Sequence, residues 1–351
     1  MRILLVRLGA IGDSIIITPL IRFLKSQGHE IYLQTSETGM QVLAHNPHVD
    51  KFIPYKTKSV TDDKLEAHWE KLAKDHGCEK IINMCESIER ALSFHPIDPV
   101  YNYTKEERHA RGNKNFYEYA FEHCNSQGTL ALFSRDSFSE HLRPELFFTE
   151  KEASSMSDFF HQFDGKFVIL WGLSGSGNNK MYPYTDYVIG DLLRDHKDVI
   201  VITVGDESCQ MLEVIEDERV IRKSGKWTIR ESLLATKYAD LVVAPDTGVL
   251  HGAGCFDTPK IGLIGSNTIE NLTKHFENDF SIEADPGLIP CAPCHRQIYQ
   301  ASTQCPIDDQ HLLPKCMSMG INPKLVLERI EIVIARFGKK ERRNRETAVS
   351  V

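Results

Sequence analysis

Short turn segments of this chain combine glycines with side chains that could bind phosphate or move a proton. Gly9–Asp13 follows an apolar run at the N-terminus, and Gly172–Lys180 and Asp246–His251 follow apolar runs further along. A carboxylate in such a turn can accept a proton, while backbone N–H groups, hydroxyls, lysine and histidine can hold phosphate oxygens. The residue types therefore indicate chemistry on a ligand that carries phosphate and hydroxyl groups.

The first turn does not match the dinucleotide-binding pattern G-x-G-x-x-G. Gly9 and Gly12 are separated by two residues and no third glycine follows. A pyrophosphate at this helix start would also face the carboxylate of Asp13, which disfavours a dehydrogenase. Asp13 lies where a strand end meets a helix start, and this place suits a general base. The alternative is a carboxylate that only caps the helix, and position alone does not decide between the two.

The segment from Asp246 to His251 is typical of a strand end followed by the first turn of a helix. Thr247 and Gly248 would offer backbone N–H groups to a pyrophosphate, and His251 lies about one turn further along the helix. Taken singly, Asp246 and Thr247 are explained as N-cap residues and His251 as a helix histidine. Taken together, they favour a phosphate site.

The glycine-rich turn Gly172–Lys180 is a second candidate for phosphate binding. Its hydroxyls, Ser174 among them, and the Lys180 amine could surround phosphate oxygens, but neither serine nor threonine follows the lysine, so it is no Walker loop. The same composition suits a surface loop. Glu207 could accept from ribose hydroxyls or cap a helix, and Trp227 could stack on a base or fill the core.

Four of the nine cysteines are clustered, at Cys291, Cys294, Cys305 and Cys316. A C-x₂-C knuckle with two further cysteines nearby is the composition of a tetrahedral site for Zn or Fe, and His295 is a substitute ligand. Reduced buried cysteines or a disulfide are the alternatives, and a reducing compartment disfavours the disulfide. We expect such a site to be structural, because no open ligand position is indicated.

Apolar runs and helical spacing predict the elements that carry these turns. Strands are expected at 3–8, 31–33, 80–84, 167–171, 199–204, 241–244 and 260–264, and helices at 14–24, 62–76, 184–194, 208–215 and 229–237. The polar stretch 103–115 is expected to be a loop. The pattern predicts an α/β protein of two Rossmann-like halves with parallel sheets and an active site in the cleft between them.

The expected domains are an N-terminal Rossmann-like domain, 1–145, and a C-terminal Rossmann-like domain, 146–322, which includes the cysteine cluster. A C-terminal helix, 323–337, and a charged tail, 338–351, follow. We interpret the tail as solvated, with attraction to anionic lipid headgroups as the alternative.

The composition is that of a folded globular chain. It has 351 residues, 41% of them hydrophobic, and a formal net charge of −8, which argues against a global electrostatic attraction to nucleic acid. No apolar run approaches the roughly 18 residues of a membrane span, and the N-terminus is unlike a signal peptide. We therefore expect a cytoplasmic protein.

These motifs together resemble glycosyltransferase family 9, the ADP-heptose heptosyltransferases of lipopolysaccharide assembly. The resemblance lies in the opening Ile3–Asp13 with Thr18-Pro19-Leu20, in the turn 172–180, and in Asp246-Thr247-Gly248-x-x-His251. It implies a GT-B fold with parallel sheets, inversion at the anomeric carbon and catalysis without a metal.

By this resemblance, Asp13 is the general base that accepts a proton from the acceptor hydroxyl. The resemblance places Asp246 toward the donor sugar, Glu207 at the ribose and Trp227 beside the base. It implies diphosphate contacts from Ser174, Lys180, Thr247, Gly248 and His251. The cysteine segment is similar to the cysteine finger of autotransporter heptosyltransferases, which modify proteins and hold an iron there.

The expected function is transfer of a sugar, heptose from ADP-heptose, to a hydroxyl of a glycan, a lipopolysaccharide or a protein. A sugar-nucleotide epimerase with a GT-B-like fold and a non-catalytic nucleotide-sugar-binding module are the alternatives. A nucleotide sugar is the expected donor, and a structural Zn or Fe is the expected metal. Peripheral contact with the inner membrane and a homo-oligomer are left open by the sequence.

Overall fold

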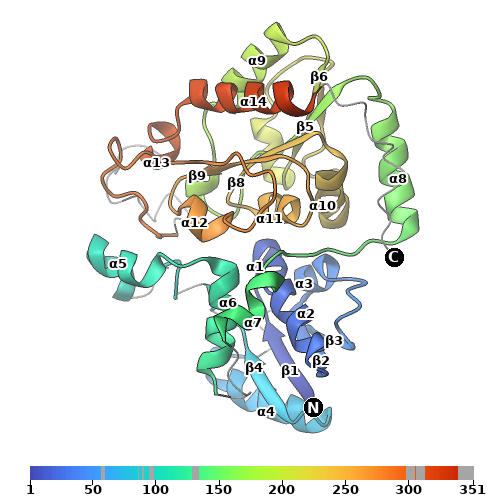
Figure 1. The fold of residues 1–351 in the computed structure, drawn as a ribbon, viewed down its shortest axis with the longest axis vertical. Helices are drawn as coiled ribbons and strands as arrows, with labels where there is room; N and C mark the ends of the chain where they lie inside the picture. The colour runs from blue at the N-terminus through green and yellow to red at the C-terminus, as the bar shows by residue number, and fades with distance from the viewer. Residues whose placement is uncertain are drawn as a thin grey trace. The chain divides into compact units, whose positions relative to one another are not determined.

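The computed structural model describes residues 1–56, 60–85, 87–88, 91–94, 99–128, 134–297, 305 and 313–338. It divides into two compact units. The first unit comprises residues 1–92 and 114–147, and the second comprises residues 93–113 and 148–351 (Figure 1). The segment 93–113, which the sequence analysis placed in the N-terminal domain, thus packs with the second unit.

The first unit is built on a four-stranded sheet in which every strand pair is parallel. The strand order is β3-β2-β1-β4. The strands are β1 (Arg2–Arg7), β2 (Glu30–Ser36), β3 (Lys51–Tyr55) and β4 (Lys80–Asn83). Five of the six residues of β1 are buried, as expected for a strand inside a parallel sheet. Leu4 and Val6 pack against helix α4 (Leu65–Asp75).

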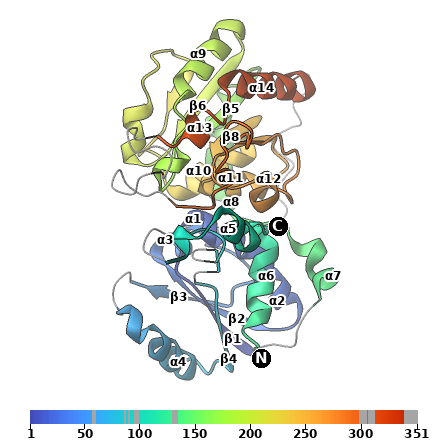
Figure 2. The same cartoon turned by 90° about the vertical axis from the view of Figure 1, so that its left-hand side faces the viewer.

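The helix expected at 14–24 is divided in two. α1 spans Ile11–Ile16 and α2 spans Thr18–Ser26, and Pro19 lies in the first turn of α2. Proline donates no N–H and so favours the start of a helix over its interior. α2 buries its apolar face in the unit core and lies beside α6 (Phe116–Ser126), as Figure 2 shows. The described helices of this unit also include α3 (Glu37–Val42) and α7 (Arg135–Phe138).

The second unit is built on a six-stranded parallel sheet of order β10-β9-β8-β5-β6-β7. Its central strands read as continuous apolar runs because both faces are covered. The strands are β5 (Phe167–Gly172), β6 (Val199–Val204), β7 (Val220–Arg222), β8 (Leu241–Pro245), β9 (Lys260–Ile264) and β10 (Ile282–Glu283).

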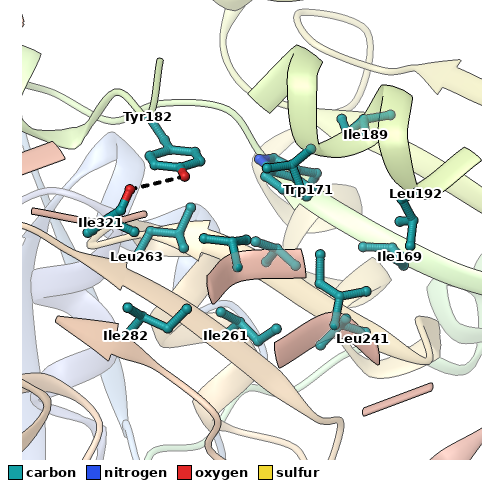
Figure 3. Packing of buried hydrophobic residues seen from close by; sticks show 14 of the residues in the cluster. Ile169, Trp171, Tyr182, Ile189, Leu192, Leu241, Ile261, Leu263, Ile282 and Ile321 are labelled. Atoms are coloured by element: carbon teal, nitrogen blue, oxygen red, sulfur yellow. Dashed lines mark hydrogen bonds between the residues drawn. The ribbon is translucent and has the colours of Figure 1, made fainter. Parts of the chain in front are cut away.

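Alternate residues of β5 feed two hydrophobic clusters, one on each face of the sheet. Ile169 and Trp171 belong to the cluster formed with α9 (Thr185–Asp195) and α14 (Pro323–Phe337), part of which Figure 3 shows. Val168 and Leu170 belong to the cluster formed with α8 (Glu150–His161) and α10 (Ile229–Tyr238). Each such buried side chain contributes about 1.5–3 kcal/mol of transfer free energy, so the sheet is a rigid base for the turns at its edge.

The described residues of the second unit also form three shorter helices. They are α11 (Gly248–Gly254), which follows β8, α12 (Ile269–Leu272), which follows β9, and α13 (Lys315–Ser318). The helix expected at 208–215 is a short 3₁₀ helix, η5 (Glu207–Leu212). The charged tail lies outside the described residues from position 339 onward. Nowhere in the described part of the chain is a helix both long and apolar enough to cross a membrane.

The prediction of a loop at 103–115 is wrong, because α5 (Lys105–Gly112) occupies most of this segment. Thr104 and Glu107 form a reciprocal capping box: Oγ1 of Thr104 accepts from the Glu107 N–H at 3.2 Å, and the Thr104 N–H donates to Oε2 of Glu107 at 2.8 Å. Such caps stabilise a helix that has no broad apolar face. Contacts with residues 290–297, described below, hold the helix on the second unit.

Candidate active site

The candidate site of the second unit lies at the carboxyl edge of its sheet. β5 pairs with β6 on one side and with β8 on the other, so the chain reverses its direction of travel across the sheet beside β5. Open α/β sheets bind ligands at such a switch point, outside the carboxyl ends of the strands. Lys180 follows β5 and Asp246 follows β8, so the topology brings these two predicted residues together.

Asp246 is the centre of a buried charged cluster. Its Oδ2 lies 3.4 Å from Nζ of Lys180, and its Oδ1 lies 3.4 Å from Nε2 of His251. Burial by itself would raise the pKa of the Asp246 carboxyl, but Lys180 and His251 outweigh it and lower that pKa below its usual range. The carboxylate is therefore ionised and aligns two potential phosphate ligands.

The glycine-rich turn packs directly on this cluster. A Cβ at Gly175 would lie 2.8 Å from Cγ2 of Thr247 and 2.9 Å from Cδ of Lys180, closer than folded proteins allow. A residue without a side chain is therefore required at this approach. Oγ1 of Thr247 is buried and has no hydrogen-bond partner among the described residues. A buried hydroxyl of this kind is suited to donate to an oxygen of a ligand.

Ser174 and Glu207 lie at the same edge of the sheet, after β5 and β6. Ser174 is half-buried, and its hydroxyl lies 3.5 Å from the carbonyl oxygen of its neighbour Gly175. Glu207 is exposed, and the cap of η5 is instead Asp206, whose Oδ1 accepts from the Cys209 N–H at 3.1 Å. The helix-capping alternative for a carboxylate of this segment is therefore met by Asp206, and the Glu207 carboxylate faces solvent.

Trp227 packs against the core of the second unit. Its ring lies edge-to-face with Phe159 at a centroid distance of 5.1 Å, and Nζ of Lys223 lies 5.4 Å from its centroid. These contacts correspond to the core-filling alternative. Trp227 is still half-buried rather than buried, so part of the indole stays accessible.

The sequence analysis missed one member of the Asp246 cluster. Nδ2 of Asn267 donates to Oδ2 of Asp246 at 3.2 Å, and the Asn267 side chain is buried. Asn267 stands three residues after β9, which pairs with β8. The rule that ligand-binding residues follow the carboxyl ends of adjacent parallel strands could have found it.

Asp13 occupies the equivalent place in the first unit, after β1 and beside the switch between β1 and β4. Its Oδ2 accepts from the Ala10 N–H at 2.8 Å, and its Oδ1 lies 3.0 Å from Nη2 of the buried Arg7. A Cβ at Gly9 would lie 2.6 Å from Cβ and Oδ2 of Asp13. The carboxylate is therefore held at the helix start, as the capping alternative requires, yet its side chain is 21% exposed and accessible to a substrate.

The four predicted cysteines come together around one small cavity of the second unit. Cys291, Cys294, Cys305 and Cys316 all line it, together with Arg296 and Lys315. Burial raises the pKa of the Cys294 thiol to about 11. As placed, the described side chains contain no group of three or more His, Cys, Asp or Glu arranged to hold a metal ion.

His295 is not placed as a metal ligand. Its Nε2 lies 2.7 Å from Oδ1 of Asn113 and its Nδ1 lies 3.2 Å from Oδ1 of Asn267, so both ring nitrogens are engaged. The side chain is fully buried, and this burial lowers the pKa of the imidazole to about 3. A neutral imidazole carries one N–H and can donate to only one of these two amide oxygens, and with both ring nitrogens facing amide oxygens neither is placed as a metal ligand.

Two units, each built on a parallel sheet with polar and charged side chains at its switch point, have the organisation of the GT-B fold. The model of glycosyltransferase family 9 (heptosyltransferase) matches residues 77–293, and the chain belongs to this family. No curated protein matches it.

Solved structures share the fold over nearly the whole chain. The family 9 glycosyltransferase from Veillonella parvula DSM 2008 has 15% identity and a TM-score of 0.67, covering 95% of this chain and 97% of that one. The ADP-heptose LPS heptosyltransferase II of E. coli has 15% identity and a TM-score of 0.64, covering 96% and 99%. The iron-containing dodecameric glycosyltransferase TibC of enterotoxigenic E. coli H10407 has 11% identity and a TM-score of 0.59, covering 97% and 77%.

Proposed function

We propose that the chain transfers heptose from ADP-heptose to a hydroxyl acceptor with inversion at the anomeric carbon. The observation that carries this proposal is the buried Asp246 cluster, in which Lys180 and His251 meet beside the unpartnered hydroxyl of Thr247. Cation, imidazole and hydroxyl together are the donor set that a leaving diphosphate requires. The choice of ADP-heptose is supported by family membership and by the complex of TibC with ADP-D-β-D-heptose.

Each residue of the cluster has a proposed task on the donor. Lys180, Thr247, His251 and the Gly248 N–H hold the diphosphate and stabilise the charge that develops as the glycosidic bond breaks. Asp246 aligns Lys180 and His251 and faces the donor sugar. Ser174 supplies a further hydroxyl to the diphosphate, the exposed carboxylate of Glu207 accepts from the ribose, and the accessible part of Trp227 contacts the base.

Asp13 is proposed as the general base that removes the proton of the acceptor hydroxyl. Its carboxylate is partly exposed and is held by Arg7 and the Ala10 N–H, which fix the orientation of its oxygens. A positioned base of this kind contributes typically about 10²–10⁴-fold to a rate. The proposed acceptors are a glycan, a lipopolysaccharide or a protein hydroxyl.

Gly9→Ala is expected to reduce transfer by disturbing this base. The added methyl group would collide with Asp13 at 2.6 Å, so the carboxylate must shift. We expect a drop in kcat of about 10-fold or more, since small displacements of a reacting group can cost up to about 10²-fold. The matched control is Gly190→Ala in α9, where no atom lies within 4 Å of the new Cβ. Equal kcat for Gly9→Ala and wild type would contradict the base role.

We propose that the four cysteines hold a structural metal, iron or zinc. All four cysteines line one cavity, and four thiolates would complete a tetrahedral site without an open position for a reaction. Bound there, the metal would cross-link residues 291–316. TibC is described as iron-containing, which favours iron. We propose that catalysis itself needs no metal.

Purified protein is expected to hold about one equivalent of iron or zinc per chain. Elemental analysis of protein prepared without added metal measures this directly. Cys294→Ser should lower the metal content severalfold, because the loss of one of four thiolate ligands weakens metal binding strongly. Cys124→Ser, at a buried cysteine of the first unit, is the matched control. A wild-type content below about half an equivalent would contradict the proposal.

The donor is tested by thermal unfolding with a panel of ADP-, GDP- and UDP-sugars. A ligand at about 100 times its Kd stabilises the fold by about 2.7 kcal/mol, so the true donor should give the largest rise in Tm. We expect ADP-heptose to give that rise. A larger rise with a GDP- or UDP-sugar would overturn the donor assignment.

A further inference from the structure

A series of polar side-chain contacts links the carboxyl end of α5 to the Asp246 carboxylate. Asn113 caps the carboxyl end of α5, and its Oδ1 lies 2.7 Å from Nε2 of His295. Nδ1 of His295 lies 3.2 Å from Oδ1 of Asn267, whose Nδ2 donates to Oδ2 of Asp246 at 3.2 Å. All four residues belong to the second unit. His295 is the middle residue of this series of contacts.

The backbone of His295 is fixed on both sides. Its N–H donates to the Ser266 carbonyl oxygen at 2.8 Å, and its own carbonyl oxygen accepts from the Phe94 N–H at 2.7 Å. Its φ is +57°, in the left-handed region that only a few per cent of non-glycine residues adopt, with asparagine, aspartate and histidine the most frequent among them. The surroundings therefore determine where the imidazole points.

α5 anchors the cysteine loop, which we define as residues 290–297, from the other side. Nε of Arg108 donates to the Cys294 carbonyl oxygen at 2.9 Å, and Nε2 of His109 lies 2.7 Å from the Pro293 carbonyl oxygen. Lys105 also donates to the Pro290 carbonyl oxygen. Arg108 is buried, so its guanidinium is an integral part of the packing. The helix, the cysteine loop and the Asp246 cluster thus form one hydrogen-bonded assembly.

We propose that His295 is a positioning residue of the donor site, through which the cysteine loop sets the orientation of Asn267 and hence of the Asp246 carboxylate. Without the imidazole, the Asn267 amide is free to rotate and Asp246 loses a fixed donor. Lys180 and His251 both contact that carboxylate, each at 3.4 Å. The inference rests on the proposed function, because it assumes that the Asp246 cluster binds the diphosphate.

The test is the Kd of ADP, measured by calorimetry on the full-length protein and its variants. His295→Phe keeps a ring but has no nitrogen to donate to Oδ1 of Asn267, and the loss of that hydrogen bond should weaken ADP binding by about 10-fold. His295→Asn places an amide near the position of Nδ1 and tolerates the positive φ, so it should restore most of the affinity. Metal content measured on the same samples should stay unchanged, because the cysteines are retained.

Gln297→Leu is the matched control on the same loop. Gln297 is buried, and its Nε2 donates to Oγ of Ser93 at 3.1 Å, so its loss loosens the loop without touching Asn267. We expect its Kd for ADP to stay within about twofold of wild type, although its Tm falls. If His295→Phe does not fold, Asn113→Ala replaces it, because Asn113 is exposed and only the outer contact is lost.

The outcomes separate the two proposals. A wild-type protein that binds no ADP overturns the proposed function. A wild-type protein that binds ADP, with His295→Phe and Asn113→Ala binding it equally well, overturns the positioning role alone. Equal weakening by His295→Phe, His295→Asn and Gln297→Leu also overturns that role, because it would reflect loop packing in general.

Discussion

Asp13→Asn is expected to lower kcat for sugar transfer by about 10²–10⁴-fold, while the Kd of ADP changes by less than about twofold. The carboxamide keeps the shape of the side chain but cannot accept the proton of the acceptor hydroxyl. Donor binding should persist because every proposed donor contact belongs to the second unit, whereas Asp13 belongs to the first. Steady-state kinetics with saturating donor and calorimetry with ADP measure the two quantities.

Arg7→Gln distinguishes the proposed catalytic role of the Asp13 carboxylate from the structural role of its ion pair with Arg7. Arg7 holds one oxygen of Asp13, and the Ala10 N–H holds the other, so the variant leaves the carboxylate in place but less firmly oriented. We expect a clearly smaller loss of kcat than for Asp13→Asn. If both variants are folded and lose kcat equally, Asp13 serves the structure of the turn and the proposed base is wrong.

Lys180→Met is expected to raise the Kd of ADP by about 10–100-fold. Methionine keeps the length of the side chain and removes the ammonium, which is worth about 1.5–3 kcal/mol in a charge-assisted hydrogen bond. The variant should also lower Tm, because the buried Asp246 carboxylate loses the Lys180 ammonium and keeps, of the contacts described above, those with His251 and the Asn267 amide. Calorimetry and thermal unfolding check these two expectations.

Lys166→Met is the matched control for that variant. The side chain of Lys166 is 41% exposed and pairs with Asp198 at 2.6 Å on the surface of the same unit, where such pairs contribute about 0–1 kcal/mol. We expect its Kd for ADP to equal that of wild type. An unchanged Kd in Lys180→Met would place the diphosphate away from the Asp246 cluster.

The sequence predicted the sheets well because their central strands are buried on both faces. β5 and β8 are apolar runs bounded by turn residues, β9 is apolar after Lys260, and the observed ends of all three lie within one residue of those expected. β3 was missed because exposed residues and Pro54 interrupt its apolar pattern, as expected near a sheet edge. Edge strands carry a weaker pattern than central ones.

α5 was not predicted because tertiary contacts stabilise it more than its own sequence does. Its residues are almost all polar, so no apolar stripe is visible, and only the capping box could have indicated a helix. Its anchors on the cysteine loop join residues more than 180 positions apart. No local pattern carries that information.

The candidate site was predicted in part for the same reason. Lys180, Asp246 and His251 were found because each lies in a turn of recognisable composition after a strand. Asn267 lies in a turn of ordinary composition, and its contact with Asp246 is set by the pairing of β8 with β9. His295 was interpreted as a metal ligand because it adjoins Cys294, but its partners Asn113 and Asn267 come from distant segments.

The most direct test of the proposed transfer is ADP release from ADP-heptose by purified wild-type protein, with and without cell-envelope acceptors. We predict ADP formation that requires an acceptor, matches the heptosylated product one for one, and is lost in Asp13→Asn. Conversion of the donor to another sugar nucleotide without an acceptor would show an epimerase. Tight binding of ADP-heptose with no ADP released under any acceptor condition would contradict the account.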